Sequence, residues 1–140
     1  MGNFKKEIIM KSRIARPAPT ILTYGIAEDS EKFLKINALC KKLNVLLKVI
    51  SYKDTSQQLG YLFGFNGFSR NDDAPQEIPL LECMVFSGFN SKEFDKILNQ
   101  LKANNIKTDL KAVVTAHNQK WTFEKLITEL LKEKSSLESE

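Results

Sequence analysis

The chain has 140 residues, of which 42% are hydrophobic and 27% are charged. This length and composition are typical of one globular domain that buries a core of its own. The apolar runs are a few residues long, far short of the roughly 20 that a membrane-spanning helix needs. We find no Gly-X-Y period, heptad seam or internal repeat, which excludes fibrous and solenoid folds.

The positive charge of the chain is concentrated at its N-terminus. The formal net charge is +4, and residues 1–16, which hold five basic side chains and Glu7, account for all of it. We predict a basic arm over residues 1–19, one α/β domain over residues 20–132 and a charged tail over residues 133–140. The arm could contact the phosphates of nucleic acid or only improve solubility. Its basic side chains are Lys5, Lys6, Lys11, Arg13 and Arg16.

The cysteines and the single histidine give no pattern that predicts a metal site. Cys40 and Cys83 lie far apart on predicted apolar faces, so both are expected to be buried and reduced. One histidine without a cysteine cluster argues against structural zinc. Residues 8–10 are too short to be the apolar core of a secretory signal. We therefore expect a cytosolic protein without a metal or cofactor, and without membrane attachment.

The hydrophobic pattern alternates between strands and helices. Strands are predicted at residues 20–26, 45–52, 81–87 and 110–115, each followed by a helical segment. Asp29 or Ser30 is expected to cap the helix that ends near Asn44, and Asn90 with Glu93 forms a predicted capping box. A short helix follows at residues 57–63, and the last helix begins near residue 122. Residues 65–79 are polar and form the longest predicted loop.

The strand pattern predicts an α/β fold built from two βαβ-like halves. Strands 20–26 and 81–87 are nearly apolar on both faces, which favours helices on both sides of a largely parallel sheet. The right-handed crossover rule then allows the strand order 2-1-3-4. The alternative is a ferredoxin-like βαββαβ fold of order 4-1-3-2 with an extra C-terminal helix. Both orders place the same two strands in the centre, so burial cannot separate them.

The most specific pattern lies in the second half of the chain. It is the run LKAVVT at residues 110–115, followed by Asn118 and Trp121, with MVFSGF at residues 84–89 upstream. Together with YGI at 24–26 and LGYL at 59–62, these residues resemble a bacterial family known only as a domain of unknown function, number 3783. The resemblance covers roughly residues 20–132. It implies a bacterial cytosolic protein and supplies no activity, cofactor or catalytic residue.

Small and polar residues follow the predicted strands. In a parallel sheet the carboxyl ends of all strands meet at one edge, where they could form a ligand crevice. The same residue types are also those that turns require, and in the ferredoxin-like alternative the ends are divided between two edges. The candidate ligand or partner residues are Tyr24, Gly25, Ser87, Gly88, Lys111, Thr115, His117, Asn118 and Trp121.

Several of these candidates also have purely structural explanations. Asn118 is placed to hold the turn into the last helix, and Trp121 to anchor that helix. His117 could act as a general base or lie exposed in a turn. Four aromatic residues within positions 61–68 could form a stacking platform, a partner surface or the cover of one sheet face.

No group of residues predicts catalysis, so we lean against an enzyme. We expect a non-catalytic cytosolic binding or regulatory module that acts on a protein partner or as a homo-oligomer. One alternative is a nucleic-acid or ribosome-associated accessory protein that uses the basic arm. Another is a small-ligand sensor or weak enzyme that uses the crevice at the strand ends.

Overall fold

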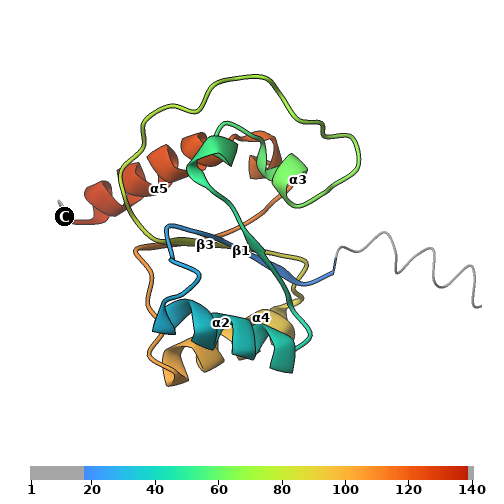
Figure 1. Cartoon of the computed structure of the whole chain (residues 1–140), viewed down its shortest axis with the longest axis vertical. Coiled ribbons are helices and arrows are strands. Elements are labelled where there is room, and N and C mark those ends of the chain that lie inside the picture. The colour runs from blue at the N-terminus through green and yellow to red at the C-terminus, as the bar shows by residue number, and fades with distance from the viewer. Residues whose placement is uncertain (1–17, 139–140) are drawn as a thin grey trace, which may run out of the picture.

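The computed structural model describes residues 18–138, which form a four-stranded sheet between two helical layers (Figure 1). Helices α2 and α4 cover one face of the sheet, and α3 and α5 cover the other. The strands are β1 (Thr20–Tyr24), β2 (Leu46–Val49), β3 (Cys83–Ser87) and β4 (Leu110–Val113). The helices are α2 (Glu31–Lys42), α3 (Leu59–Leu62), α4 (Ser91–Ala103) and α5 (Phe123–Glu138), with 3-10 turns η1 (Tyr52–Asp54) and η2 (Asn118–Lys120).

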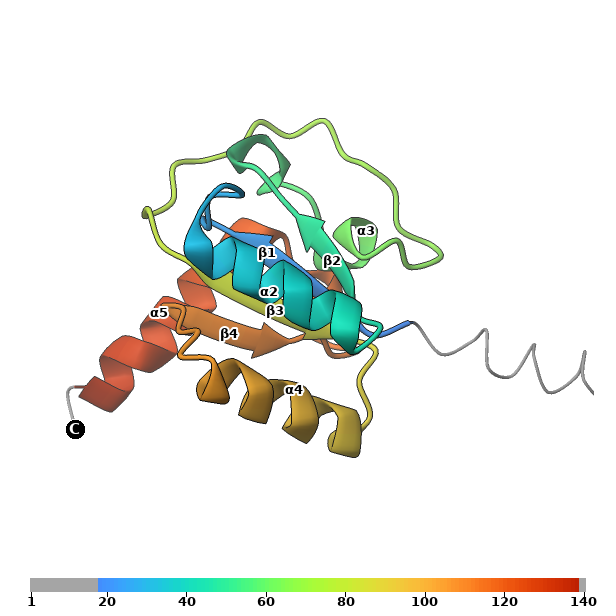
Figure 2. The ribbon, with the colours of Figure 1, turned by 60° about the horizontal axis from the view of Figure 1, so that its bottom comes forward.

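The strand order is β2-β1-β3-β4, which confirms the predicted order 2-1-3-4 and excludes the ferredoxin-like alternative. β1 and β2 are parallel, as are β3 and β4. The central pair β1 and β3 is antiparallel, so the expectation of a parallel sheet is wrong at this pair. Figure 2 shows the consequence, because the arrows of β2 and β4 point in opposite directions.

The direction of β3 follows from the path of the chain before it. Residues 64–82 run back along the molecule (Figure 2), so that β3 begins beside the end of β1. The approach is close, since a Cβ on Gly25 would stand 1.9 Å from the carbonyl oxygen of Leu81. Burial of β1 and β3 on both faces comes from the two helical layers. Helices can cover both faces of β1 and β3 whether these strands are parallel or antiparallel. The apolar pattern of the sequence therefore did not reveal the strand direction.

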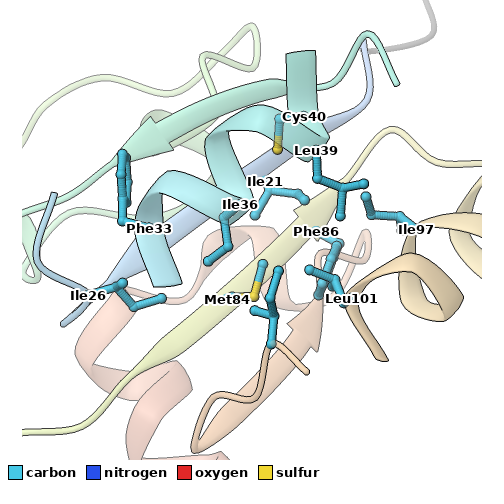
Figure 3. Packing of buried hydrophobic residues seen from close by; sticks show 11 residues of the cluster. Ile21, Ile26, Phe33, Ile36, Leu39, Cys40, Met84, Phe86, Ile97 and Leu101 are labelled. Carbon is cyan, nitrogen blue, oxygen red and sulfur yellow. The ribbon is translucent and has the colours of Figure 1, made fainter. Parts of the chain in front are cut away.

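Side chains of the sheet alternate between two cores. Ile21 of β1 and Phe86 of β3 pack against α2 and α4, together with Ile36 and Ile97 from those helices (Figure 3). Leu22, the next residue of β1, belongs to the core beneath α3 and α5. The alternation is that of any strand covered on both faces. Complete burial of each such aliphatic side chain contributes roughly 1.5–3 kcal/mol before entropy is counted.

Polar side chains cap the starts of α2 and α4. The Ser30 hydroxyl accepts a hydrogen bond from the backbone N–H of Phe33, and so begins α2. Asn90 and Glu93 form the predicted capping box at the start of α4, with both reciprocal bonds present. At the other end of the chain, α5 continues to Glu138. Part of the predicted charged tail is therefore helical.

The two halves of the domain repeat the same architecture about an approximate twofold axis. Residues 20–62 and 83–126 each contain strand, helix, strand, 3-10 turn and the start of a helix. Leu22 pairs with Val85, its own counterpart, at the centre of the antiparallel pair. Glycines with positive φ follow both central strands, at Gly25 (φ 80°) and Gly88 (φ 84°).

Backbone hydrogen bonds follow the same symmetry. Leu46 N donates to Pro19 O at 2.9 Å, and its counterpart Leu110 N donates to Glu82 O at 3.0 Å. Between the halves, Leu59 N donates to Trp121 O at 2.8 Å and Phe123 N donates to Gln57 O at 3.0 Å. The two halves are thus a structural repeat, although the sequence shows no internal repeat. Unequal connections and unlike side chains, such as TILTY in β1 against CMVFS in β3, conceal it in the sequence.

Candidate functional site

Because β1 and β3 are antiparallel, the residues that follow the four strands lie at two opposite edges of the sheet. These edges run along the ends of the strands and are distinct from the edge strands β2 and β4. Tyr24 pairs with Cys83, and Thr20 pairs with Ser87. Tyr24 and Gly25 therefore lie at the edge where β3 begins, which we call the covered edge because residues 78–82 lie there. Residues 87–88 and 115–118 follow β3 and β4 and lie at the opposite edge, called the open edge. The predicted crevice formed by all four strand ends does not exist.

Thr115 and Asn118 bond to each other in the turn after β4. The Asn118 Oδ1 atom accepts from Thr115 N at 2.7 Å, and Thr115 Oγ1 accepts from Asn118 N at 3.0 Å. Asn118 Nδ2 also donates to the carbonyl oxygen of Val113 at 3.1 Å. This reciprocal arrangement holds the chain as it enters η2.

Lys111 and Trp121 lie on opposite faces of the sheet. Lys111 lines a shallow hollow beside α4 together with Lys102 and Lys107. Trp121 packs against the core beneath α5. The exposed His117 ring meets the Trp121 ring edge-on, with centroids 5.5 Å apart, and Lys125 Nζ lies 5.1 Å from the Trp121 ring centre. The residues of the most specific sequence pattern, Lys111, Thr115, Asn118 and Trp121, therefore do not form one cluster.

The two thiols and the buried phenol are held in their neutral forms. Burial raises the pKa of Cys40 to about 11 and that of Cys83 to about 12. Both cysteines are free and buried, as the sequence predicted. Burial, with a smaller effect of nearby Tyr52, also raises the pKa of Tyr24. None of these three groups is ionised near neutral pH, so they supply no ready nucleophile.

A pocket of about 590 Å³ lies at the open edge. The first residues of β1 and β2 and the last residue of β3 form its floor, and the chain that follows α3 forms one wall. Phe63 and Phe65 stack in that wall with their ring centroids 5.9 Å apart. We refer to this site as the open-edge pocket; its principal side chains are Leu46, Lys48, Phe63, Phe65, Ser87 and Gln119.

Polar and apolar groups alternate around the open-edge pocket. Leu46 is 55% exposed within it. Lys48 lies on the same face of β2, and its Nζ donates to the carbonyl oxygen of Leu62 at 3.2 Å. The side chain of Gln119 donates to the Ala116 carbonyl oxygen at 3.2 Å. The lining therefore combines hydroxyl groups, aliphatic and aromatic side chains, a lysine and an amide, which is the mixture of groups that binding pockets use.

Of the predicted site residues that the structure describes, only Ser87 lines the open-edge pocket, and Gly88 lies in a smaller hollow beside it. The sequence pattern missed Leu46, Lys48 and Gln119. The sequence shows Lys48 as a charged residue of a predicted edge strand. Charged residues are common on edge strands, so this position alone does not indicate a binding site. Of the three interpretations of the aromatic residues near position 63, the structure confirms the cover of a sheet face, and it does so for Phe63. Phe63 is buried in the core, whereas Phe65 is half-buried at the pocket.

Two classes of site are not found among residues 18–138. No group of three metal-ligating side chains comes together there. In the same part of the chain, no helix is long and apolar enough to cross a membrane. The basic side chains Lys5, Lys6, Lys11, Arg13 and Arg16 of the predicted nucleic-acid arm lie outside the described residues.

The fold and pocket define a small α/β domain of two similar halves with one open edge. Residues 82–137 match the model of a family described as "Domain of unknown function (DUF3783)". This match confirms the resemblance over the second half, from the start of β3 into α5. The predicted extent toward residue 20 lies outside the matched region. No curated protein and no solved structure matches the chain.

Proposed function

We propose that the protein is a non-catalytic binding module whose binding surface is the open-edge pocket. The observation that carries this proposal is the exposure of Leu46, an aliphatic side chain in a concave site between stacked phenylalanines and Lys48. Exposed apolar surface with a polar rim is typical of interaction sites. A pocket of this volume is large enough for a few side chains of a partner or for a small ligand.

The state of the reactive groups supports binding rather than catalysis. The two thiols are buried and protonated. His117 packs against Trp121, and Thr115 and Asn118 are engaged in their turn. None of these side chains lines the open-edge pocket. The free cysteines also support our proposal of a reducing compartment, the bacterial cytosol.

Site-directed photo-crosslinking in living cells tests this function. A photoreactive amino acid replaces Leu46 in one strain and Val113 in a control strain. Val113 is matched because it lies on the other edge strand and is 45% exposed. We expect a discrete set of adducts at position 46 and none at position 113. Adducts at both positions alike, or at neither, would contradict a binding role for the pocket.

A further inference from the structure

We propose that the open-edge pocket binds an extended peptide segment that carries aliphatic side chains beside a carboxylate. This inference rests on the proposed function and adds the chemistry of the partner. It comes from comparing the pocket with its counterpart in the other half of the domain. The approximate twofold axis places the same backbone framework at both edges, so the two edges differ in their side chains and in what covers them.

The counterpart of the pocket is filled by the chain itself. The pocket residues Thr20, Leu46 and Phe63 correspond to Cys83, Leu110 and Ile127, which belong to one buried cluster. Leu110 is 7% exposed, whereas Leu46 is 55% exposed, although both begin an edge strand and donate the same ladder hydrogen bond. Among residues 18–138, the sheet surface is therefore covered in the second half and uncovered in the first.

Two segments provide the cover in the second half. α5 extends well beyond the counterpart of the four-residue helix α3, and its Leu130 and Leu131 pack on the cluster. Ile78 and Leu81, from the chain that leads into β3, pack on the same cluster. In the first half the chain leaves the helix at Gly64, where φ is +77°, and no such cover follows among the described residues.

The covering segment suggests the form of the missing partner. Residues 78–82 contain no helix or turn, and Pro79 favours extended backbone at Ile78. The aliphatic side chains of Ile78 and Leu81 point into the core while Leu80, between them, is 95% exposed. In a regular strand, residues three apart face opposite sides, so this segment is extended without the regular strand repeat. A partner segment of the same extended but irregular form can present two aliphatic groups, three residues apart, to Leu46 and the stacked phenylalanines.

Lys48 adds a charge preference that the covered edge lacks. Its counterpart in the second half is Ala112, and the pocket lining contains no carboxylate among residues 18–138. Lys48 is half-buried and its ammonium group donates to α3 at the Leu62 carbonyl oxygen. A partner carboxylate there would lose less of its attraction to salt screening than on an open surface. The preferred peptide therefore carries an acidic residue next to its aliphatic side chains.

The chain supplies a suitable probe for this specificity. We would titrate the full-length protein, labelled with nitrogen-15, with a capped synthetic peptide that copies residues 76–82, QEIPLLE. Saturable shifts are expected at the amides of Leu46, Gly64 and Ser87. Lys48→Glu should weaken binding at least tenfold, which corresponds to about 1.4 kcal/mol. Lys111→Glu, an equal charge change on the other edge strand, should leave the affinity unchanged.

Reversing the charge of both the peptide and residue 48 strengthens the test. A peptide with lysine in place of both glutamates should bind the Lys48→Glu variant more tightly than the unaltered protein. The proposal is overturned if no saturable shift occurs, or if Lys48→Glu has no effect. It is also overturned if the shifts appear at Tyr24, Gly25 and Leu110, because the peptide would then be displacing the chain's own segment at the covered edge.

The two proposals can fail separately. If position 46 forms adducts in cells but the peptide does not bind, the proposed binding function stands. The inference that the partner is an extended acidic and aliphatic peptide is then wrong. Adducts that join position 46 to nucleic acid, or to residues 1–17 of the same chain, would likewise overturn the peptide class alone. If position 46 forms no adduct and the peptide does not bind, both proposals fall.

Discussion

Two threonines of β1 differ in whether their hydroxyl groups are satisfied. Thr23 is completely buried, and its Oγ1 has no hydrogen-bond partner among the described residues. Thr20 is also buried, but its Oγ1 donates to the Ala18 carbonyl oxygen at 2.9 Å. An unpaired buried hydroxyl costs free energy, whereas a paired one contributes to stability. The same residue type should therefore respond in opposite directions at these two positions.

Replacement of each threonine by valine tests this difference, because valine keeps the shape of the side chain. Thr23→Val should raise the free energy of unfolding by about 1 kcal/mol, and Thr20→Val should lower it by about 1 kcal/mol. Urea denaturation at neutral pH measures both. If Thr23→Val destabilises the protein as much as Thr20→Val does, the hydroxyl of Thr23 has a partner after all.

The buried thiols make stability depend on pH in the alkaline range. The pKa of Cys83 rises from 9.0 to about 12 on folding, and that of Cys40 to about 11. Below pH 9 both thiols are protonated in the folded and unfolded states, so their contribution is constant. Above pH 9 the unfolded chain loses these protons first, and the free energy of unfolding falls as pH rises toward the folded values.

We expect the urea midpoint to be flat from pH 7 to about pH 8.5 and then to fall. Cys83→Val should reduce the slope above pH 9 without abolishing it, since Cys40 and Tyr24 shift in the same direction. A slope that is identical in the variant and the unaltered protein would show that Cys83 ionises equally in both states.

At the scale of elements, the turn after β1 lies close against the segment that leads into β3. Gly25 has a φ of +80°, and a Cβ there would stand 1.9 Å from the Leu81 carbonyl oxygen. Both the backbone conformation and the space require glycine at this position. Gly67 has a φ of +88° but no heavy atom within 4 Å of the corresponding Cβ position. Alanine substitutions at Gly25 and Gly67 therefore distinguish the cost of steric conflict from the cost of backbone strain.

Gly25→Ala should lower the free energy of unfolding by about 3 kcal/mol or more, because β3 must move away from the end of β1. Gly67→Ala should cost about 1–2 kcal/mol, the strain of a left-handed alanine alone. Thermal and urea denaturation of both variants measures the difference. Equal losses would mean that Leu81 does not approach Gly25 as closely as described.

The turn after β4 provides a second test at this scale. Asn118→Ala removes the bonds from Asn118 to Thr115 N and to the Val113 carbonyl oxygen. We expect a loss of about 1–2 kcal/mol in unfolding free energy, with the affinity for the residue 76–82 peptide changed less than twofold. A folded variant that has lost the peptide affinity would restore Asn118 to the list of binding residues.

The order of elements was predictable because their signals are local. Apolar periodicity located the strands and helices, and Ser30 and Asn90 marked the helix starts. Strand direction was not predictable, because burial on both faces of β1 and β3 is the same whether they are parallel or antiparallel. The direction depends on the course of residues 64–82, a polar segment with no periodic pattern.

At the scale of the whole molecule, the candidate site arises from unequal halves. Two similar βαβ units share one sheet, but only the second carries a long final helix and a covering segment. The pocket is the surface of the first half that the described residues leave uncovered. It could not be predicted from the sequence, because Leu46 and Leu110 occupy equivalent strand positions and differ only in what packs over them. The aromatic residues after α3 were the one visible signal.

Hydroxyl-radical footprinting in living cells tests the central claim most directly, by comparing side-chain oxidation in the cell with that of the purified protein. Leu46 and Phe65 line the pocket, while Val113 and Leu80 are exposed elsewhere. We predict that oxidation of Leu46 and Phe65 falls in the cell relative to Val113 and Leu80, because a partner covers the pocket there. Equal oxidation ratios in the cell and in the purified protein would contradict a binding function at the open edge.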